Sequence, residues 1–340
     1  MKRSRNDGEE VEEEEEERME SSSSSSSSSS SAAPATKQMQ ITARLPTSLC
    51  TMNADVLRYL MKSVQVDDLK NILFVNKFLK GIVCSYLEQL LMKSTFSISE
   101  DFSNLNGAWK MLAVLPHLPN YDPNKKVTLK LGKGVYEVVG SFTNPAVGTY
   151  QQMLSVPCTN LSIVGGGQGK TTVHGGLVAE NGNHVSIIGL TVMNPRGSGL
   201  VALGVGTKME ISRVTIKECQ NYGVYVREGA KFDGTGCHFY QNRWSGVFVA
   251  GSTTTARLTN CTSHHNKDHG VYADNDAVVD LMGEQTSVHD NERDGLAAYE
   301  RGSTINVYQP CILNDMSHGN KRQNIYRGYC SRVQQKNSKK

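Results

Sequence analysis

Hydrophobic and polar positions repeat along the second half of the chain with a period of about 24 residues. The repeat is marked by glycines spaced 24, 23, 24 and 25 residues apart: Gly199, Gly223, Gly246, Gly270 and Gly295. An apolar residue follows each glycine, and a second one follows two places later, as in Val224 and Val226. Because side chains alternate along a strand, these two residues face one side and the residue between them faces the other. The pattern predicts a short strand after each glycine.

A second short strand is predicted before each glycine, for example at Cys237 and Phe239 or at Cys261 and Ser263. A polar turn separates the two strands, and an asparagine lies four residues before its glycine: Asn242, Asn266 and Asn291. Asparagine tolerates left-handed backbone and can hydrogen-bond to its copy in a neighbouring repeat. Glycine permits a tight turn.

These features predict a mainly β fold, a right-handed parallel β-helix over residues 104–330. One repeat cannot bury its inward face alone, but stacked repeats bury a continuous core and pair their backbones. A propeller blade needs about 40 residues, and the signature of leucine-rich repeats is missing. Residues Ser103 to Leu115 read as a short amphipathic helix that caps the open end of the core, and the first strand is expected at Val127 to Leu131.

The stretch from Lys126 to about Gly175 resembles the opening of pectin-lyase-like β-helices. It contains Gly-x-Tyr-x-Val, beginning at Gly134, and then Leu-Ser-Ile-Val-Gly, beginning at Leu161. The later repeats resemble carbohydrate-binding and sugar-hydrolysis repeats. This resemblance implies a polysaccharide-active or carbohydrate-binding protein of the lyase, hydrolase or epimerase type.

The N-terminal part has a different composition. Residues 1–41 contain an acidic run and eleven consecutive serines, so they cannot bury enough apolar surface to offset their ordering entropy and are expected to be disordered. Residues 42–100 contain apolar positions at helical spacing, which predicts a small helical unit. Residues 331–340 are expected to form a tail.

The helical unit resembles the F-box, a degenerate pattern of about 45 residues. Asp68-Leu69 matches its Asp-Leu pair, and Val75-Asn76-Lys77-Phe78 lies where the family has a Val-Ser-Lys-x-Trp-like segment. The resemblance implies an adaptor-binding surface at Leu57, Leu60, Leu69, Val75 and Phe78. The alternative is an ordinary helical pack that docks on the β-helix.

Two function classes follow. In the first, the chain is the substrate-recognition subunit of an SCF-type ubiquitin ligase, whose β-helix binds a target protein through the outward residues Tyr225, Phe248 and Tyr272. In the second, it is the polysaccharide-active or carbohydrate-binding protein described above, and its partner is a glycan. An N-terminal arm or the helical unit could instead cover the three aromatic side chains.

Several polar groups are weaker candidates. Asn194, Glu218, Gln241, His265 and Asp290 lie five residues before successive glycines, beside His264 and His289, and could act as acids, bases or metal ligands. Because their identity changes at every repeat, a structural turn is favoured.

Two other patterns are disfavoured as functional sites. The glycine-rich stretch from Gly165 to Thr172 mimics a phosphate loop, but a β-helix corner is favoured because no helical pattern follows it. Asp274, Asp276 and Asp280 form the nearest acidic group, without a matched arginine. No complete catalytic constellation is found, which favours a non-enzymatic role, and no metal or cofactor is expected.

Charge and composition change this picture little. The net charge of +3 combines an acidic N-terminus with a mildly basic remainder, where no aromatic residues interleave with a basic cluster, so nucleic-acid binding is disfavoured. No apolar run of 18 residues and no signal-peptide core are found, so we expect no membrane contact and a cytoplasmic or nuclear protein, with its eight cysteines mostly as thiols.

Overall fold

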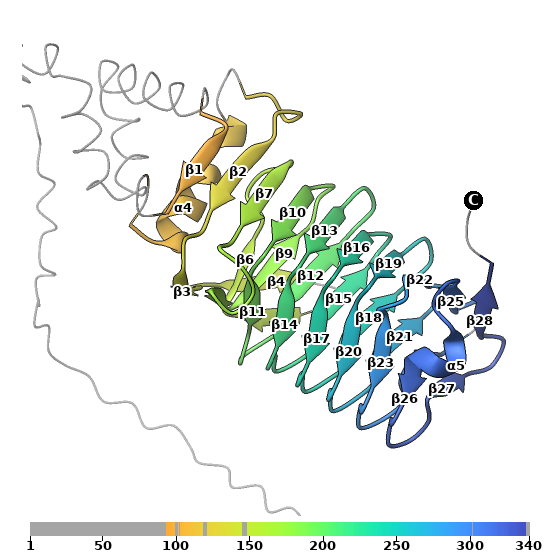
Figure 1. Cartoon of the computed structure of the whole chain (residues 1–340). Helices are drawn as coiled ribbons and strands as arrows, with labels where there is room; N and C mark the ends of the chain where they lie inside the picture. The colour runs from red at the N-terminus through yellow and green to blue at the C-terminus, as the bar shows by residue number, and fades with distance from the viewer. Residues whose placement is uncertain are drawn as a thin grey trace, which may run out of the picture. The chain divides into compact units, whose positions relative to one another are not determined.

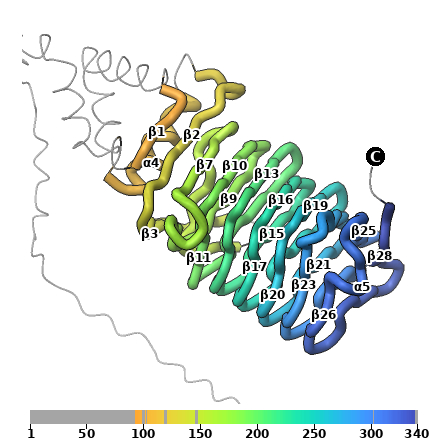
Figure 2. Tube along the Cα trace, viewed as in Figure 1, coloured from red at the N-terminus to blue at the C-terminus, as the bar shows by residue number. Residues whose placement is uncertain are grey.

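The structure, a computed structural model, describes residues 93–98, 101, 103–117, 121–144, 148–300 and 302–337. These residues form a β-solenoid of about eight turns (Figure 1). The right-handed parallel β-helix predicted from the repeat is confirmed. Figure 2 shows the chain coiling in successive turns that lie side by side along one axis.

Three parallel sheets build the solenoid, each with one strand per turn. Sheet I contains β1 (Thr95–Ser97), β2 (Val127–Lys130), β7 (Leu161–Val164), β10 (His184–Ile188), β13 (Lys208–Ser212), β16 (Lys231–Thr235), β19 (Thr255–Thr259), β22 (Val278–Met282), β25 (Thr304–Tyr308) and β28 (Arg332–Lys336). Sheet II contains β3 (Gly134–Glu137), β8 (Thr171–His174), β11 (Thr191–Met193), β14 (Thr215–Lys217), β17 (His238–Tyr240), β20 (Thr262–His264), β23 (Ser287–His289) and β26 (Ser317–His318). Sheet III contains β6 (Met153–Ser155), β9 (Gly176–Ala179), β12 (Leu200–Leu203), β15 (Val224–Arg227), β18 (Val247–Ala250), β21 (Val271–Asp274), β24 (Leu296–Ala298) and β27 (Ile325–Arg327).

The strand predicted after each glycine belongs to sheet III, and the strand predicted before it belongs to sheet II. Their registers agree with the prediction, since Val224 pairs with Val247 and Val247 with Val271. The first strand expected, at Val127 to Leu131, is β2 of sheet I and is confirmed. The sheet I strand of the later turns was not predicted. Its alternation is visible in Lys208-Met209-Glu210-Ile211-Ser212, where Met209 and Ile211 are buried. The solenoid also extends past both predicted ends, because β1 lies within the predicted helical unit and β28 within the predicted tail.

The core is a column of inward apolar side chains that runs through all turns. Val224, Val247 and Val271 are fully buried at equivalent positions. The helix α4 (Leu105–Leu112), capped by the side chain of Asn104, packs Leu105, Trp109 and Leu112 into the same core. The predicted amphipathic helix is therefore confirmed. A one-turn 3₁₀ helix (Leu115–His117) follows it, and a second short helix, α5 (Leu313–Met316), lies near the C-terminal turns.

The predicted asparagine ladder is also present. The side-chain amide of Asn242 donates to Oδ1 of Asn266 at 2.9 Å, Asn266 donates to Asn291 at 2.9 Å, and Asn291 donates to Asn320 at 2.9 Å. Left-handed backbone occurs one residue earlier than expected, at Gln241, His265 and Asp290. The glycines of the repeat are required by close approach rather than by left-handed backbone: a Cβ at Gly246 would lie 2.8 Å from the carbonyl oxygen of Gly270.

A two-stranded antiparallel hairpin interrupts this regular pattern. It consists of β4 (Ser141–Asn144) and β5 (Gly148–Gln151) and lies outside the three sheets. Phe142 and Tyr150, which face each other across the hairpin, are both buried. The hairpin therefore packs its apolar face against another surface of the molecule, which is the outer face of sheet III.

Candidate functional site

The outer face of sheet III bears a row of aromatic side chains. Tyr225, Phe248 and Tyr272 are register partners on β15, β18 and β21, as the alternation predicts. The ring centroids of Tyr225 and Phe248 are 5.4 Å apart, and those of Phe248 and Tyr272 are 4.7 Å apart. The three rings are therefore in continuous contact along the solenoid axis.

Two of these three residues are covered. Tyr225 is 5% exposed and Phe248 is 8% exposed, because Phe142 and Tyr150 of the hairpin join the same apolar cluster. Tyr222, from the turn before β15, stacks on Phe248 at 4.7 Å. Of the three predicted ligand-binding residues, only Tyr272 is partly accessible, and their role in binding remains a prediction.

The accessible aromatic surface begins beside the covered rings and continues into the C-terminal turns. It consists of rings contributed partly by sheet III and partly by the turns beside it, and we call it the aromatic band: Tyr222, Trp244, Tyr272, Tyr299 and Tyr326. Tyr222 meets Trp244 edge-on at 4.8 Å, Tyr272 meets Tyr299 at 5.0 Å, and Tyr299 stacks on Tyr326 at 4.5 Å. Trp244 is 43% exposed.

A charged network lies along the edge of the aromatic band, in the turns between sheets II and III. The buried imidazole of His269 lies between two carboxylates: its Nδ1 is 3.2 Å from Asp294 Oδ2, and its Nε2 is 3.5 Å from Asp268 Oδ1. Arg293 donates to Asp268 at 2.9 Å, and Arg322 donates to Asp294 at 3.5 Å. We call these five residues the His269 network.

Burial dominates the electrostatics of this network. It lowers the pKa of His269 to about 4, so the imidazole is neutral at neutral pH, and it raises the pKa of Asp294. Asp294 is fully buried, and its Oδ1 has no hydrogen-bond partner among the described residues. The guanidinium of Arg322 partly compensates for this burial and also donates to the phenol oxygen of Tyr299 at 3.3 Å.

The chemistry available at this site is that of binding. Exposed rings can stack on flat apolar faces of a ligand, while the half-exposed Arg293 and Arg322 and the partly exposed Asp268 can hydrogen-bond to its polar groups. A pair of carboxylates that flank a scissile bond must both reach the substrate. Because Asp294 is buried, only Asp268 of this pair can do so.

A second polar row lies on the outer face of sheet I and was not predicted, because the strands that carry it were not recognised. Glu210, Asp233, Arg257 and Asp280 are successive register partners on β13, β16, β19 and β22. The expectation that Asp280 groups with Asp274 and has no matched arginine is wrong, since Asp274 lies on sheet III and Arg257 is the register partner of Asp280. Residues about 24 positions apart become neighbours only when the turns are stacked.

The predicted polar ladder has a structural explanation. Glu218, Gln241, His265 and Asp290 have φ values between 52° and 57°, so they form the left-handed corners that end the strands of sheet II. The stretch from Gly165 to Thr172 likewise contains a corner, which leads directly into the strand β8 at Thr171 rather than into a helix. Within the part of the chain that the structure describes, no three acidic, histidine or cysteine side chains converge as metal ligands, and no helix is long and apolar enough to cross a membrane.

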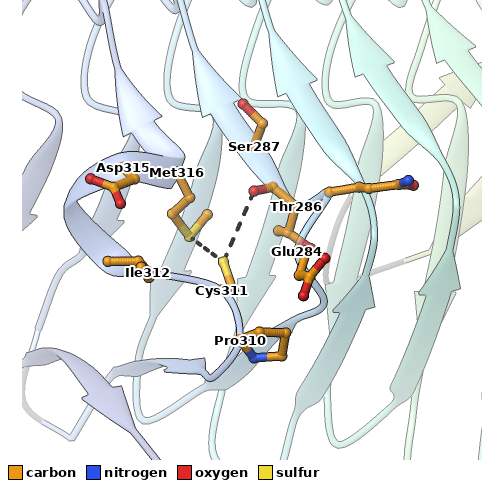
Figure 3. Close-up of a pocket in the computed structure, with 9 residues that line it drawn as sticks. Glu284, Thr286, Ser287, Pro310, Cys311, Ile312, Asp315 and Met316 are labelled. Atoms are coloured by element: carbon orange, nitrogen blue, oxygen red, sulfur yellow. Dashed lines mark hydrogen bonds between the residues drawn. The ribbon is translucent and has the colours of Figure 1, made fainter.

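One cavity lies apart from these surfaces. Its volume is 370 Å³, and Figure 3 shows it between the turn at Glu284–Ser287 and the segment around α5. Cys311 lines it, with its sulfur 3.3 Å from the sulfur of Met316. Burial raises the pKa of Cys311 to about 11, so the thiol stays protonated and is a poor nucleophile.

The residues predicted to bind an adaptor lie outside the described residues: Leu57, Leu60, Leu69, Val75 and Phe78. Their role, and that of the ligase adaptor as a partner, remains a prediction.

Comparison with known proteins supports the fold. A family model described as "Right handed beta helix region" matches residues 175–333. No curated protein matches the chain. The chain is similar to the Azotobacter vinelandii mannuronan C-5 epimerase AlgE6 A-module, with 13% identity, a TM-score of 0.39, and coverage of 60% of this chain and 68% of that one.

Two further solved structures show the same level of similarity. The Agl-KA catalytic domain has 14% identity and a TM-score of 0.42, with coverage of 66% of this chain and 41% of that one. Pectate lyase Pel9A has 12% identity and a TM-score of 0.36, with coverage of 64% and 52%. At these identities and scores, activity and substrate are not transferred to this chain.

Proposed function

We propose that this protein binds a polysaccharide, which lies along the aromatic band of the β-helix. The observation that supports this proposal is the run of partly exposed rings from Tyr222 to Tyr326. Contiguous exposed apolar surface of this kind marks an interaction site. Because each of five successive turns adds one ring, the surface suits a long, regular ligand.

The distribution of polar groups agrees with a sugar polymer. Tyrosine and tryptophan offer an apolar ring together with a polar atom, which suits ligands that have both apolar faces and hydroxyl groups. Arg322 is held by the buried Asp294 and lies beside Tyr299 and Tyr326, and Arg293 is held by the partly buried Asp268. These pairs restrain the two guanidinium groups before a ligand binds, which reduces the side-chain entropy lost on binding. The band therefore combines stacking with fixed hydrogen-bond donors.

A binding assay tests the proposal. Purified protein is titrated with a panel of soluble neutral and acidic polysaccharides by calorimetry, together with a double variant, Trp244→Ala with Tyr299→Ala. At least one polysaccharide should bind, and the double variant should bind it at least ten times more weakly. Tyr329→Ala is the matched control, because Tyr329 is 85% exposed and outside the band.

Two results contradict the proposal. Absence of binding to every polysaccharide in the panel removes its basis. Binding that the double variant leaves unchanged places the ligand elsewhere on the molecule. Release of new reducing ends or unsaturated sugars in the same samples would additionally identify an enzyme.

A further inference from the structure

The outer face of sheet II carries a column of stacked rings that the proposed function does not use. Tyr240, His264, His289 and His318 occupy equivalent positions on β17, β20, β23 and β26. The centroid distances from Tyr240 to His264, from His264 to His289 and from His289 to His318 are 5.0, 5.0 and 5.1 Å. The planes of neighbouring rings differ by 8° at most. We call His264, His289 and His318 the imidazole column.

The stacking leaves the edges of these imidazoles, rather than their faces, as the accessible surface. Nδ1 of His264 is 2.8 Å from Nδ1 of His265, and Nδ1 of His289 is 2.7 Å from Oδ2 of Asp290. His264 and His289 are partly exposed, and His318 is exposed. A protonated column would therefore present a row of N–H donors and positive charges along the solenoid axis.

The charged and titratable groups around the column determine its response to pH. On one side Lys217 lies 5.9 Å from the ring of Tyr240, but it is paired with Glu218 at 2.8 Å. Asp290 is the acidic group that contacts the column. The groups around the column on its own strands and the adjoining turns are Lys217, Glu218, His238, Tyr240, His265 and Asp290. The helix α5, which packs against β23 and β26, carries one titratable residue, Asp315.

Neighbouring imidazoles oppose one another's protonation. The pKa of His264 is lowered to about 4, first by burial and then by His289, His265 and His238. Positive charges about 5 Å apart repel one another, and an anion placed against two of them removes the repulsion. Anion binding and proton uptake at the column must therefore favour each other.

We propose that the imidazole column is a second ligand-binding surface, which holds the anionic groups of a sulfated or carboxylated glycan when its histidines are protonated. The class of ligand rests on the proposed function, whereas the site is a different face of the solenoid from the aromatic band. A nucleic-acid strand fits less well, because its bases need exposed ring faces and the faces here are occupied by neighbouring rings. The regular spacing of the column suits a polymer with repeated negative charges.

The test uses dextran sulfate, whose charge does not change between pH 5.0 and pH 7.5, with neutral dextran as the matched probe. The full chain should bind dextran sulfate at least ten times more tightly at pH 5.0 than at pH 7.5. Calorimetry in two buffers of different ionisation enthalpy should show net proton uptake on binding at pH 5.0. The triple variant His264→Gln, His289→Gln and His318→Gln should lose both effects.

The matched control is His184→Gln, since His184 lies on β10 of sheet I, beside Glu210 and away from the column. It should retain the pH dependence of the full chain. If the triple variant does not fold, the single variant His318→Gln, at an exposed position, should reduce the ratio of the two affinities by at least half. Equal affinity at both pH values, or a triple variant that keeps the tenfold difference, overturns the proposal.

The same experiment separates this inference from the proposed function. Trp244→Ala with Tyr299→Ala should leave the pH dependence of dextran sulfate binding unchanged. If the column variant loses its binding while no polysaccharide of the panel, neutral or acidic, shows binding that Trp244→Ala with Tyr299→Ala weakens, the proposed function fails and the column stands. If inorganic polyphosphate binds at pH 5.0 more tightly than dextran sulfate does, a glycan is the wrong ligand class.

Discussion

The two halves of the outer face of sheet III have the same strand register but opposite surroundings. Towards the N-terminal turns, Val201, Tyr225 and Phe248 are buried beneath the β4–β5 hairpin. Towards the C-terminal turns, Tyr299 and Tyr326 stay partly exposed. Alternation along a strand decides which way a side chain points, whereas its accessibility depends on what packs against that face. The covered half should therefore contribute to stability and the open half to binding.

The largest loss of stability is expected for a substitution on the inward side of the same strands, because both halves share the core that these side chains form. Val247 is fully buried next to Phe248, and Val247→Asp places an unpaired charge in the core. We expect a loss of at least about 4 kcal/mol in the free energy of unfolding, measured by urea denaturation followed by circular dichroism. An unchanged denaturation midpoint would mean that the assigned register is wrong.

The difference in stability between the covered and the open half is tested by truncating one aromatic ring in each. Phe248→Ala removes a buried ring that contacts Tyr222, Tyr225 and Tyr272, so we expect about 3 kcal/mol of destabilisation. Tyr326→Ala, in the open half, should cost less than about 1 kcal/mol. Equal costs in the two variants would contradict the view that the hairpin gives the N-terminal half its structural role.

The sequence predicts the repeat better than it predicts the surfaces that the repeat creates. Glycine spacing and alternation are properties of each turn, so the inward column at Val224, Val247 and Val271 and the ladder from Asn242 to Asn291 follow directly from the sequence. The alternation of Lys208 to Ser212 is also present in the sequence, but it is short and has no marker glycine. The sheet I strands of the glycine-marked turns were not predicted for that reason, whereas β2 was.

The candidate site could not be predicted to the same extent, because it depends on contacts between turns. The His269 network joins residues 25 to 28 positions apart, such as His269 with Asp294 and Asp294 with Arg322. Trp244 lies in a turn rather than on the outward row of a strand. The hairpin that covers Tyr225 lies outside the repeat, so no periodic signal places it there. These groups become neighbours only when the turns stack in register.

The free energy of unfolding should depend on pH through His269, which contacts Tyr272 and Tyr299 beside the open half of sheet III. The pKa of His269 is about 4 in the folded protein and about 6.5 in an unfolded chain, so the unfolded state binds more protons between these values. Stability should therefore fall as pH decreases from about 6.5 towards 4, and this residue should contribute a loss of about 2 kcal/mol between pH 7 and pH 5.

Urea denaturation at the two pH values measures this loss. The variant His269→Gln should show a smaller difference between pH 7 and pH 5 than the unmodified protein does. His318→Gln is the control, because His318 is exposed and lies outside the His269 network. A difference that is unchanged in His269→Gln would show that the buried imidazole does not titrate as the structure indicates.

The smallest effect on stability is expected for Trp244→Ala. Trp244 is 43% exposed and is the most exposed ring of the aromatic band. Trp244 meets Tyr222 edge-on, so its removal should cost less than about 1 kcal/mol in the free energy of unfolding. The same substitution should weaken polysaccharide binding measurably, since the ring lies at the rim of the band. Phe248→Ala should show the reverse balance, with a large loss of stability and, at temperatures where it is folded, a smaller change in affinity than Trp244→Ala. A Trp244→Ala variant that unfolds easily and binds normally would reverse the roles assigned to the exposed ring of Trp244 and the covered ring of Phe248.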